Sequence, residues 1–167
     1  MLFDSERLYT RFFTMDDLDH FYRLNGDEEI VRYIRAPKTY EECREFLGQV
    51  IAWYSSSGIN WRVALVSKEN DEIVGSFAII PIGETKDMQL GYSLLKEYWG
   101  RGYATEITQA GALYAFQKLA YSSIAAITEA ANIASQKVLQ KSGFGLELEY
   151  EDGDKKLLRF RRNRDQI

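Results

Sequence analysis

A short glycine-containing segment between an expected strand and a long expected helix constrains this fold more than any other feature. The stretch Gly91 to Glu106 reads GYSLLKEYWGRGYATE, and Gly100 and Gly102 stand where the strand would pass into the helix. Glycines let the backbone turn sharply and approach a ligand closely, and the first amides of a helix have no partner within the helix. The junction therefore predicts an anion site made of backbone donors.

The donors of this site are specified by position more than by side chain. We expect the amides of Gly102, Tyr103, Ala104 and Thr105 to face a pyrophosphate. Arg101 would add a charged contact to a phosphate, although a solvent-facing loop arginine has the same sequence pattern. The P-loop is absent because no lysine followed by Ser or Thr comes after the second glycine. A dinucleotide fingerprint is disfavoured because this loop follows several antiparallel-looking strands.

The rest of the chain predicts strands and helices in one continuous domain, residues 1–167, without repeats or a linker. The expected strands are 6–13, 61–67, 72–80, 89–95, 123–128, 144–150 and 156–161. The expected helices follow Thr14 and Thr39 or span 104–119 and 132–141, with ends at Ser55 to Gly58 for the second and at Gly143 for the last. A content of 46% hydrophobic residues suffices for a single buried core.

Charge and cysteine content narrow the function classes. The net charge of -4 argues against general attraction to nucleic acid and is compatible with a cationic amine substrate. For the arginine-rich tail, residues 159–164, a solvated final strand is preferred over a phosphate contact. Apolar stretches are too short to cross a bilayer, the start of the chain lacks an export pattern, and Cys43 is the single cysteine. We therefore expect a cytoplasmic protein without membrane partners.

Two segments, in the right order, resemble the motifs of the GNAT N-acetyltransferase superfamily, specifically its ribosomal-protein (RimJ/RimL-like) branch. GYSLLKEYWGRGYATE resembles that branch's acetyl-coenzyme A signature. NIASQKVLQKSGF, residues 132–144, resembles its motif of Asn, a Ser three residues later, an apolar pair and a closing Gly-Phe. The resemblance covers essentially the whole chain. Trp99 departs from the Arg or Gln that the superfamily usually has in the loop, and Gln140 stands where Glu is common.

The resemblance implies an α/β (α+β) fold with a mostly antiparallel central sheet, flanked by helices and splayed between strands 89–95 and 123–128. The pantetheine arm of acetyl-coenzyme A, the co-substrate, would lie in that notch. The backbone near Tyr92 and Leu94 would pair with it and polarise the acetyl carbonyl. Asn132 would contact the arm and also cap its own helix. Ser135 would either protonate the departing thiolate or only pack near the sulfur.

The acceptor amine must lose a proton before or during attack, and the sequence singles out no base. Glu129, just beyond the strand 123–128, is the first candidate. Other carboxylates near the expected cleft mouth are Glu84, Glu149 and Glu151, and each alone also fits a solvated surface. His20 fits a surface or packing role, Cys43 fits the core, and no ligand-spaced set predicts a metal site.

Four aromatic residues are expected to cluster where the first two helices meet the following strand: Tyr33, Trp53, Tyr54 and Trp61. Core packing is their first interpretation, and some would also wall the acceptor pocket, which in the resembled family lies opposite the coenzyme.

These observations predict an N-acetyltransferase that moves an acetyl group from acetyl-coenzyme A to a primary amine by direct attack, because no plausible nucleophile is present. Branch resemblance favours the N-terminal amine of a protein or peptide as the acceptor. A polyamine or an antibiotic amine stays open, as does a non-catalytic acyl-coenzyme A sensor or interaction module. A homodimer is also open, since the sequence carries no signal for or against it.

Overall fold

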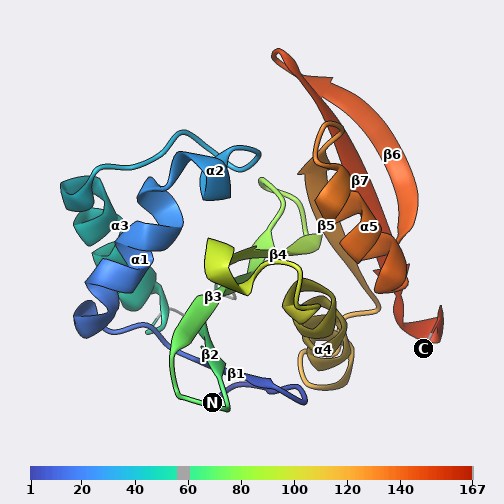
Figure 1. Ribbon diagram of the computed structural model, residues 1–167. Coiled ribbons are helices and arrows are strands. Elements are labelled where there is room, and N and C mark those ends of the chain that lie inside the picture. The colour runs from blue at the N-terminus through green and yellow to red at the C-terminus, as the bar shows by residue number, and fades with distance from the viewer. Residues whose placement is uncertain (56–60, 167) are drawn as a thin grey trace.

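The computed structural model describes residues 1–55 and 61–166, which fold around one seven-stranded sheet (Figure 1). The strands are β1 (Leu8–Arg11), β2 (Trp61–Ser67), β3 (Ile73–Pro81), β4 (Met88–Leu94), β5 (Ser123–Glu129), β6 (Gly145–Asp152) and β7 (Lys155–Asn163). The helices are α1 (Leu18–Gly26), α2 (Glu28–Val31), α3 (Tyr40–Trp53), α4 (Tyr103–Gln117) and α5 (Ile133–Lys141). Three 3₁₀ turns occupy Met15–Asp17, Lys96–Tyr98 and Arg164–Gln166.

The strand order is β1-β2-β3-β4-β5-β7-β6, and every neighbouring pair is antiparallel except β4 and β5. In the part of the chain that the structure describes, one parallel bridge, Gln89 to Ala125, joins these two strands. Figure 1 shows that β4 and β5 then run apart. The predicted splay between them is confirmed.

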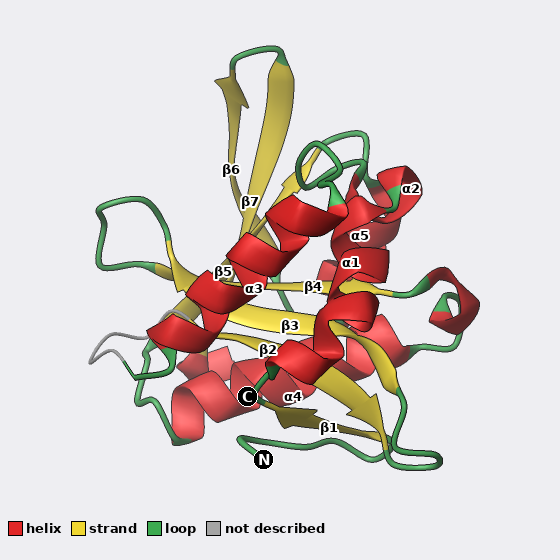
Figure 2. Ribbon diagram, turned by 90° about the vertical axis from the view of Figure 1, so that its left-hand side faces the viewer, coloured by secondary structure: helices red, strands yellow, loops and turns green. Residues whose placement is uncertain are grey.

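Two apolar layers hold the sheet, because alternate side chains of a strand point to opposite faces. Val63 and Leu65 of β2 pack with Phe77 of β3 against α4 and α5. Ala64 and Val66 pack against α1 and α3. In Figure 2, α1 and α3 cross in front of the strands and α4 lies behind them. We call the side with α1 and α3 the acceptor face and the side with α4 and α5 the coenzyme face, after the roles that the resemblance predicts.

Local capping interactions decide where the helices begin and end. Thr39 and Glu42 form a reciprocal pair at the start of α3, in which the Thr39 amide donates to Glu42 Oε2 at 2.7 Å. The Asn132 side chain accepts the Ser135 amide at 3.0 Å and starts α5. Gly143, with φ +79°, ends it. The predicted cap roles of Asn132 and Gly143 are confirmed, and the second helix follows Thr39 as predicted, while Thr14 caps the 3₁₀ turn Met15–Asp17 and not α1 itself.

Some predicted boundaries were wrong. β1 is shorter than the predicted 6–13, and a 3₁₀ turn follows Thr14 before α1 begins at Leu18. The short helix α2 was not predicted; its cap is the Asp27 carboxylate, which accepts the Glu29 amide at 3.0 Å. The predicted end of α3 at Ser55 to Gly58 lies mostly outside the described residues.

The predicted grouping of four aromatic residues was wrong for Trp61. Trp53 and Tyr54 pack against the α1–α3 layer. Trp61 is the first residue of β2, and its alternation places the ring on the opposite face, 6.2 Å from the ring of Tyr114 in α4. The neighbouring residue, Arg62, therefore takes the acceptor-face position.

Within residues 1–55 and 61–166, no helix combines the length and the apolar character needed to cross a bilayer.

Candidate functional site: a backbone anion site beside an open sheet edge

The glycine loop between β4 and α4 has the backbone conformation that its two glycines allow. Gly100 has φ +73° and Gly102 has φ +81°, both in the left-handed region that disfavours other residues. A Cβ added at Gly100 would meet no atom of the described chain within 4 Å, so this side of the loop is open. A phosphate can therefore approach the backbone at the place that the sequence predicted.

The N-terminus of α4 opens directly from this loop. Gly102 is its N-cap and has no side chain to accept a hydrogen bond, and the first intrahelical bond of the turn runs from the Glu106 amide to the Gly102 carbonyl at 3.1 Å. The amides of Gly102, Tyr103, Ala104 and Thr105 thus find no acceptor among residues 1–55 and 61–166. Unpaired amides and the helix dipole together favour an anion at this point.

Arg7 holds the glycine loop and the start of α4 through side-chain contacts that the sequence did not predict. Its Nε and Nη2 each lie 2.7 Å from Glu106 Oε2, in the first turn of α4, and its Nη1 donates to the Arg101 carbonyl at 3.0 Å. Its guanidinium carbon lies 4.5 Å from the centre of the Tyr103 ring. Arg101 itself is exposed and its guanidinium lies over the Tyr98 ring at 5.3 Å. One side chain before β1 therefore holds both the loop and the helix start.

The edge of β4 that faces β5 offers free backbone groups. The Leu95 amide donates to the Val74 carbonyl, and the next residue pair along the ladder is Gly75 with Leu94. Hydrogen-bonded and non-hydrogen-bonded pairs alternate along an antiparallel ladder. The amides and carbonyls of Leu90, Tyr92 and Leu94 therefore point away from β3. The Leu94 carbonyl accepts Trp99 Nε1 at 2.8 Å. The Tyr92 amide and carbonyl and the Leu94 amide are left for an added strand. Trp99, which departs from the family pattern, thus ties the strand end to the glycine loop.

Two hydroxyl groups meet on the coenzyme face of this edge. Tyr92 packs against the α4–α5 layer, and its phenol lies close enough to the Ser135 hydroxyl of α5 to influence its own pKa. Burial raises the pKa of the Tyr92 phenol, and the nearby Ser135 hydroxyl acts in the opposite direction. Tyr92 therefore keeps its proton at neutral pH. Asn132 lies at the start of the same helix, three residues before Ser135.

The structure separates the acidic candidates. Glu129, at the end of β5, has a side chain only 15% exposed and forms an ion pair with Lys155 of β7. Glu149 pairs with Lys156 at 2.6 Å, while Glu84 and Glu151 are exposed. His20 is partly exposed on α1. Cys43 is fully buried in the α1–α3 layer, and burial raises the pKa of its thiol.

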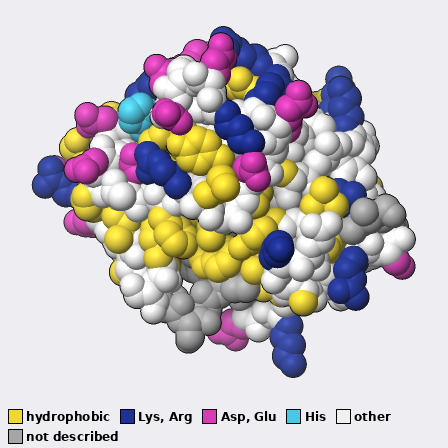
Figure 3. Space-filling model, turned by 90° about the horizontal axis from the view of Figure 1, so that it is seen from below, with side chains coloured by type: hydrophobic (Ala, Val, Ile, Leu, Met, Phe, Trp, Pro, Cys, Tyr) yellow, Lys and Arg dark blue, Asp and Glu magenta, His cyan; other side chains and the backbone are white. Residues whose placement is uncertain are grey.

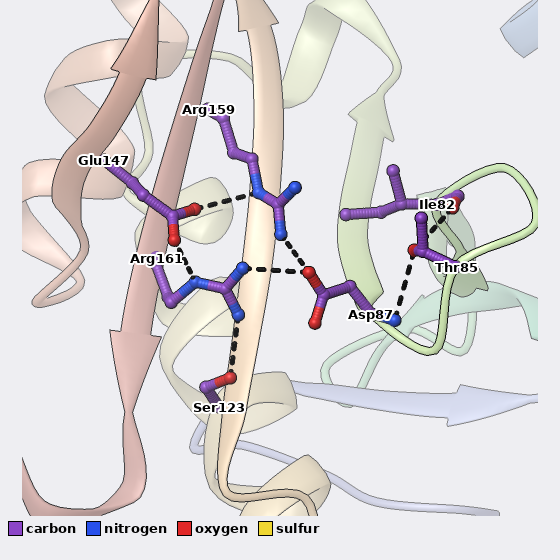
Figure 4. Close-up of polar contacts among 7 residues, drawn as sticks. All are labelled: Ile82, Thr85, Asp87, Ser123, Glu147, Arg159 and Arg161. Atoms are coloured by element: carbon purple, nitrogen blue, oxygen red, sulfur yellow. Dashed lines mark hydrogen bonds and ion pairs between the residues drawn. The ribbon is translucent and has the colours of Figure 1, made fainter.

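An ion-pair network holds the two halves of the sheet together where β4 meets β5 (Figure 4). Arg159 and Arg161 of β7 both contact the Asp87 carboxylate, Arg161 through Nη2 at 3.0 Å. On their other side, Glu147 of β6 lies 2.9 Å from Arg159 Nε and 2.6 Å from Arg161 Nε. Arg161 Nη1 also donates to Ser123 at 2.8 Å. Two cations and two anions balance here, so the network joins the start of β4 to β7 and presents no excess charge to a ligand.

Seen from below, the surface carries an apolar area with basic and acidic side chains around it (Figure 3). The two signs are interspersed on this face, so it presents no extended region of one charge.

A helix-terminal anion site beside a free edge of a splayed, mostly antiparallel sheet defines a class of transferases that use an acyl-coenzyme A. The profile of the acetyltransferase (GNAT) domain family matches residues 7–145, and the chain belongs to this family. The protein is accordingly an acetyl-coenzyme A-dependent N-acetyltransferase, with acetyl-coenzyme A as its co-substrate.

Relatives and solved structures agree with this assignment. The protein described as uncharacterized N-acetyltransferase p20 of Bacillus licheniformis is 31% identical over 160 residues, which cover 92% of this chain and 89% of that one. The structure described as RimL, a ribosomal L7/L12 alpha-N-protein acetyltransferase in complex with coenzyme A, has a TM-score of 0.83 at 17% identity and covers 98% of this chain and 97% of that one. Spermidine N-acetyltransferase from Vibrio cholerae, in complex with coenzyme A and spermine, has a TM-score of 0.80 at 17% identity, covering 95% and 96%.

Proposed function

We propose that the protein transfers the acetyl group directly from acetyl-coenzyme A to a primary amine, without a covalent enzyme intermediate. The observation that carries this proposal is the free β4 edge at Tyr92, with the Ser135 hydroxyl beside it and the α4 amides at its end. The single thiol, Cys43, is buried on the opposite layer and supports no covalent route.

In this proposal the chain's own groups bind and orient the reactants. The amides from Gly102 to Thr105, with Arg101, hold the pyrophosphate. The Tyr92 backbone and the Leu94 amide pair with the pantetheine arm, and Asn132 lies at its other side. Bound acetyl-coenzyme A supplies a thioester carbonyl for the amine to attack and a thiolate that must be stabilised as it leaves.

Ser135 and Tyr92 act together on the leaving thiolate. The neutral Tyr92 phenol lies beside Ser135 and, in this proposal, orients the Ser135 hydroxyl toward the sulfur. Removing either hydroxyl should therefore cost about as much as removing both, because the two act as one unit.

Ser135→Ala, Tyr92→Phe and the double variant test this role. We expect each to lower kcat by about 10²-fold, the usual size of a positioned acid's effect, while calorimetric affinity for coenzyme A stays within twofold. Full turnover of Ser135→Ala with the best acceptor would reduce this residue to a packing role and leave the enzyme assignment intact.

Glu129 is the carboxylate that we propose to accept the amine proton. Side chains two residues apart on a strand point to the same face, so the Glu129 side chain lies on the acceptor face with those of Ser123 and Ala125. Because Lys155 holds it, the proton must pass as that contact loosens or through water.

Lys155→Met is the matched control for Glu129→Gln. A base role predicts that Glu129→Gln loses kcat and the acidic limb of its pH profile, while Lys155→Met keeps both. Equal losses in the two variants would assign the pair a structural role only.

For the acceptor, we propose the N-terminal α-amine of a protein or peptide, supported by the branch motifs at 91–106 and 132–144. The fold likeness to a polyamine enzyme keeps a polyamine as the alternative. Thiol release from acetyl-coenzyme A should be measured across peptides, polyamines and aminoglycosides. Strong preference for spermidine over every peptide would overturn the α-amine proposal, and coenzyme binding without turnover of any acceptor would favour a sensor. A cytoplasmic location, a single domain and a homodimer stay predictions.

A further inference from the structure

Three cationic side chains surround the Phe46 ring at the acceptor face. The guanidinium carbons of Arg35 and Arg62 lie 5.5 and 5.6 Å from the ring centre, and Lys38 Nζ lies 5.5 Å from it. Among residues 1–55 and 61–166, no Asp or Glu forms an ion pair with any of the three. This differs from the Asp87 network, in which each arginine contacts two carboxylates.

The two arginines of the cluster are partly desolvated and have no carboxylate partner in the described part of the chain. Arg62 keeps some surface accessibility, yet its guanidinium is densely surrounded, and burial together with the charge of Arg35 lowers its pKa to about 10. Burial also lowers the pKa of Arg35. Both stay charged at neutral pH, and a partly buried cation without a counter-charge is costly unless an anion joins it. All three cationic residues are partly exposed, so a small anion can reach them.

Sheet register connects this cluster to the place of reaction. Arg62 is aligned with Ala78 of β3, which is aligned with Gly91 of β4, so the three positions share the acceptor face. The two aligned positions between Arg62 and the free edge at Tyr92 carry small groups: the methyl group of Ala78, which is 3% exposed, and the hydrogen of Gly91. A Cβ added at Gly91 would meet no described atom within 4 Å. The span from β2 to β4 is two strand spacings, about 10 Å.

Asn25 holds the cluster in place. Its Oδ1 accepts Arg35 Nη1 at 2.8 Å, its Nδ2 donates to the Phe21 carbonyl at 2.8 Å, and its own carbonyl accepts the Lys38 amide at 2.9 Å. Asn25 is 6% exposed. The end of α1 therefore fixes the Arg35 guanidinium and the backbone at Lys38 before any ligand arrives.

We propose that Arg62, Arg35 and Lys38 form an anion subsite that selects an acceptor amine bearing a carboxylate within about 10 Å of the reacting nitrogen. This inference rests on the proposed function, because it places that nitrogen over Gly91 at the β4 edge. The carboxylate has two sources: an acidic side chain near the N-terminus of a peptide, or the carboxylate of a free amino acid. A polyamine would be repelled here, despite the negative net charge of the whole chain.

Matched acceptors test the subsite and distinguish the two sources. One arm compares C-terminally amidated peptides that have Asp, Asn or Lys as the second residue, and the other compares free amino acids with their amides. We expect kcat/KM for the carboxylate member of at least one arm to exceed that of its amide by tenfold or more. Arg62→Met should reduce this ratio to nearly one, chiefly through KM, with unchanged affinity for coenzyme A. Arg44→Met, on the exposed side of α3, is the control that should keep the ratio.

Direct binding separates failure of the subsite from failure of the proposed function. Calorimetry with the coenzyme A-saturated protein should show that the Asp-containing peptide or free glutamate binds at least fivefold more weakly to Arg62→Met than to the unchanged protein. If no acceptor turns over but this difference is found, the proposed function fails and the subsite stands. A carboxylate preference absent from both arms, or one that Arg62→Met leaves unchanged in rate and in binding, overturns the inference. Thermal unfolding checks that Arg62→Met is folded.

Discussion

Replacing Arg7 by methionine should loosen the glycine loop and the start of α4 together. The lost contacts are the paired bonds to Glu106, the bond to the Arg101 carbonyl and the ring contact with Tyr103. The Arg7 side chain is 45% exposed, so after screening the ion pair contributes about 1 kcal/mol at most. The carbonyl bond adds about 1 kcal/mol and the ring contact about 0.5 kcal/mol. Because the contacts share one side chain and do not fully add, we expect a loss of about 2 kcal/mol.

Two measurements follow from this value. A destabilisation of about 2 kcal/mol lowers the midpoint of thermal unfolding of a domain this size by about 4–8 °C. Calorimetry should show coenzyme A binding weakened by about tenfold, equivalent to about 1.4 kcal/mol, because the loop amides must be ordered on binding. Arg23→Met is the control: its ion pair with Glu97 is half exposed on both sides, so both quantities should change little.

The same variant should change the pH dependence of stability. Burial would raise the pKa of Glu106, but hydrogen bonds from Ser5 and Arg7 outweigh it, and the pKa is lowered. A lowered folded-state pKa means that this stabilisation is complete above the unfolded value, about 4.3, and is lost as pH falls through the folded value. Arg7→Met should therefore lose less stability than the unchanged protein on acidification. An unchanged unfolding midpoint together with unchanged coenzyme A affinity would refute the role of Arg7 in holding the glycine loop and the start of α4.

Two further changes test the ion-pair network at Asp87 and the glycine loop. Asp87→Asn should lower the free energy of unfolding by about 1–2 kcal/mol, and kcat with it, because two partly buried arginines lose a charged partner. Hydrogen bonds from those arginines lower the Asp87 pKa, so the stability difference between the variant and the unchanged protein should be full above about pH 3.9 and shrink below it. Urea unfolding across pH measures this difference, and a difference that stays constant with pH would contradict the prediction. Gly102→Ala places a side chain at φ +81°, so it should lower the free energy of unfolding by about 1–2 kcal/mol and also weaken coenzyme A binding. The control is Gly153→Ala, at φ +59° in the β6–β7 turn, which should lose stability without losing coenzyme A affinity. Equal coenzyme A affinity in the two variants would argue against a role of the glycine loop in binding.

The sequence by itself determined features that depend on near neighbours in the chain. The hairpin signal at 61–80, the helical spacing after Thr39 and the cap at Asn132 are local, so they predict where these elements begin to within one residue. The glycine loop is also local, because positive φ at Gly100 and Gly102 and free amides at a helix start require only a few residues. The resemblance of two segments then predicted the family and the splay.

Only the tertiary structure decided which side chains share a face and meet across the sheet. Register aligned Arg62 with Ala78 and Gly91, and the segment between α2 and α3 brought Arg35 and Lys38 to the Phe46 ring that Arg62 also approaches. The net charge of -4 gave no sign of this basic cluster, because a net charge sums over the whole chain. Burial strengthens the electric field of a few cations that lack a carboxylate partner. Arg7 was likewise invisible in sequence, since its partner in α4 lies ninety-nine residues away. Long-range contacts set the local charge and position on which the proposed acceptor subsite depends.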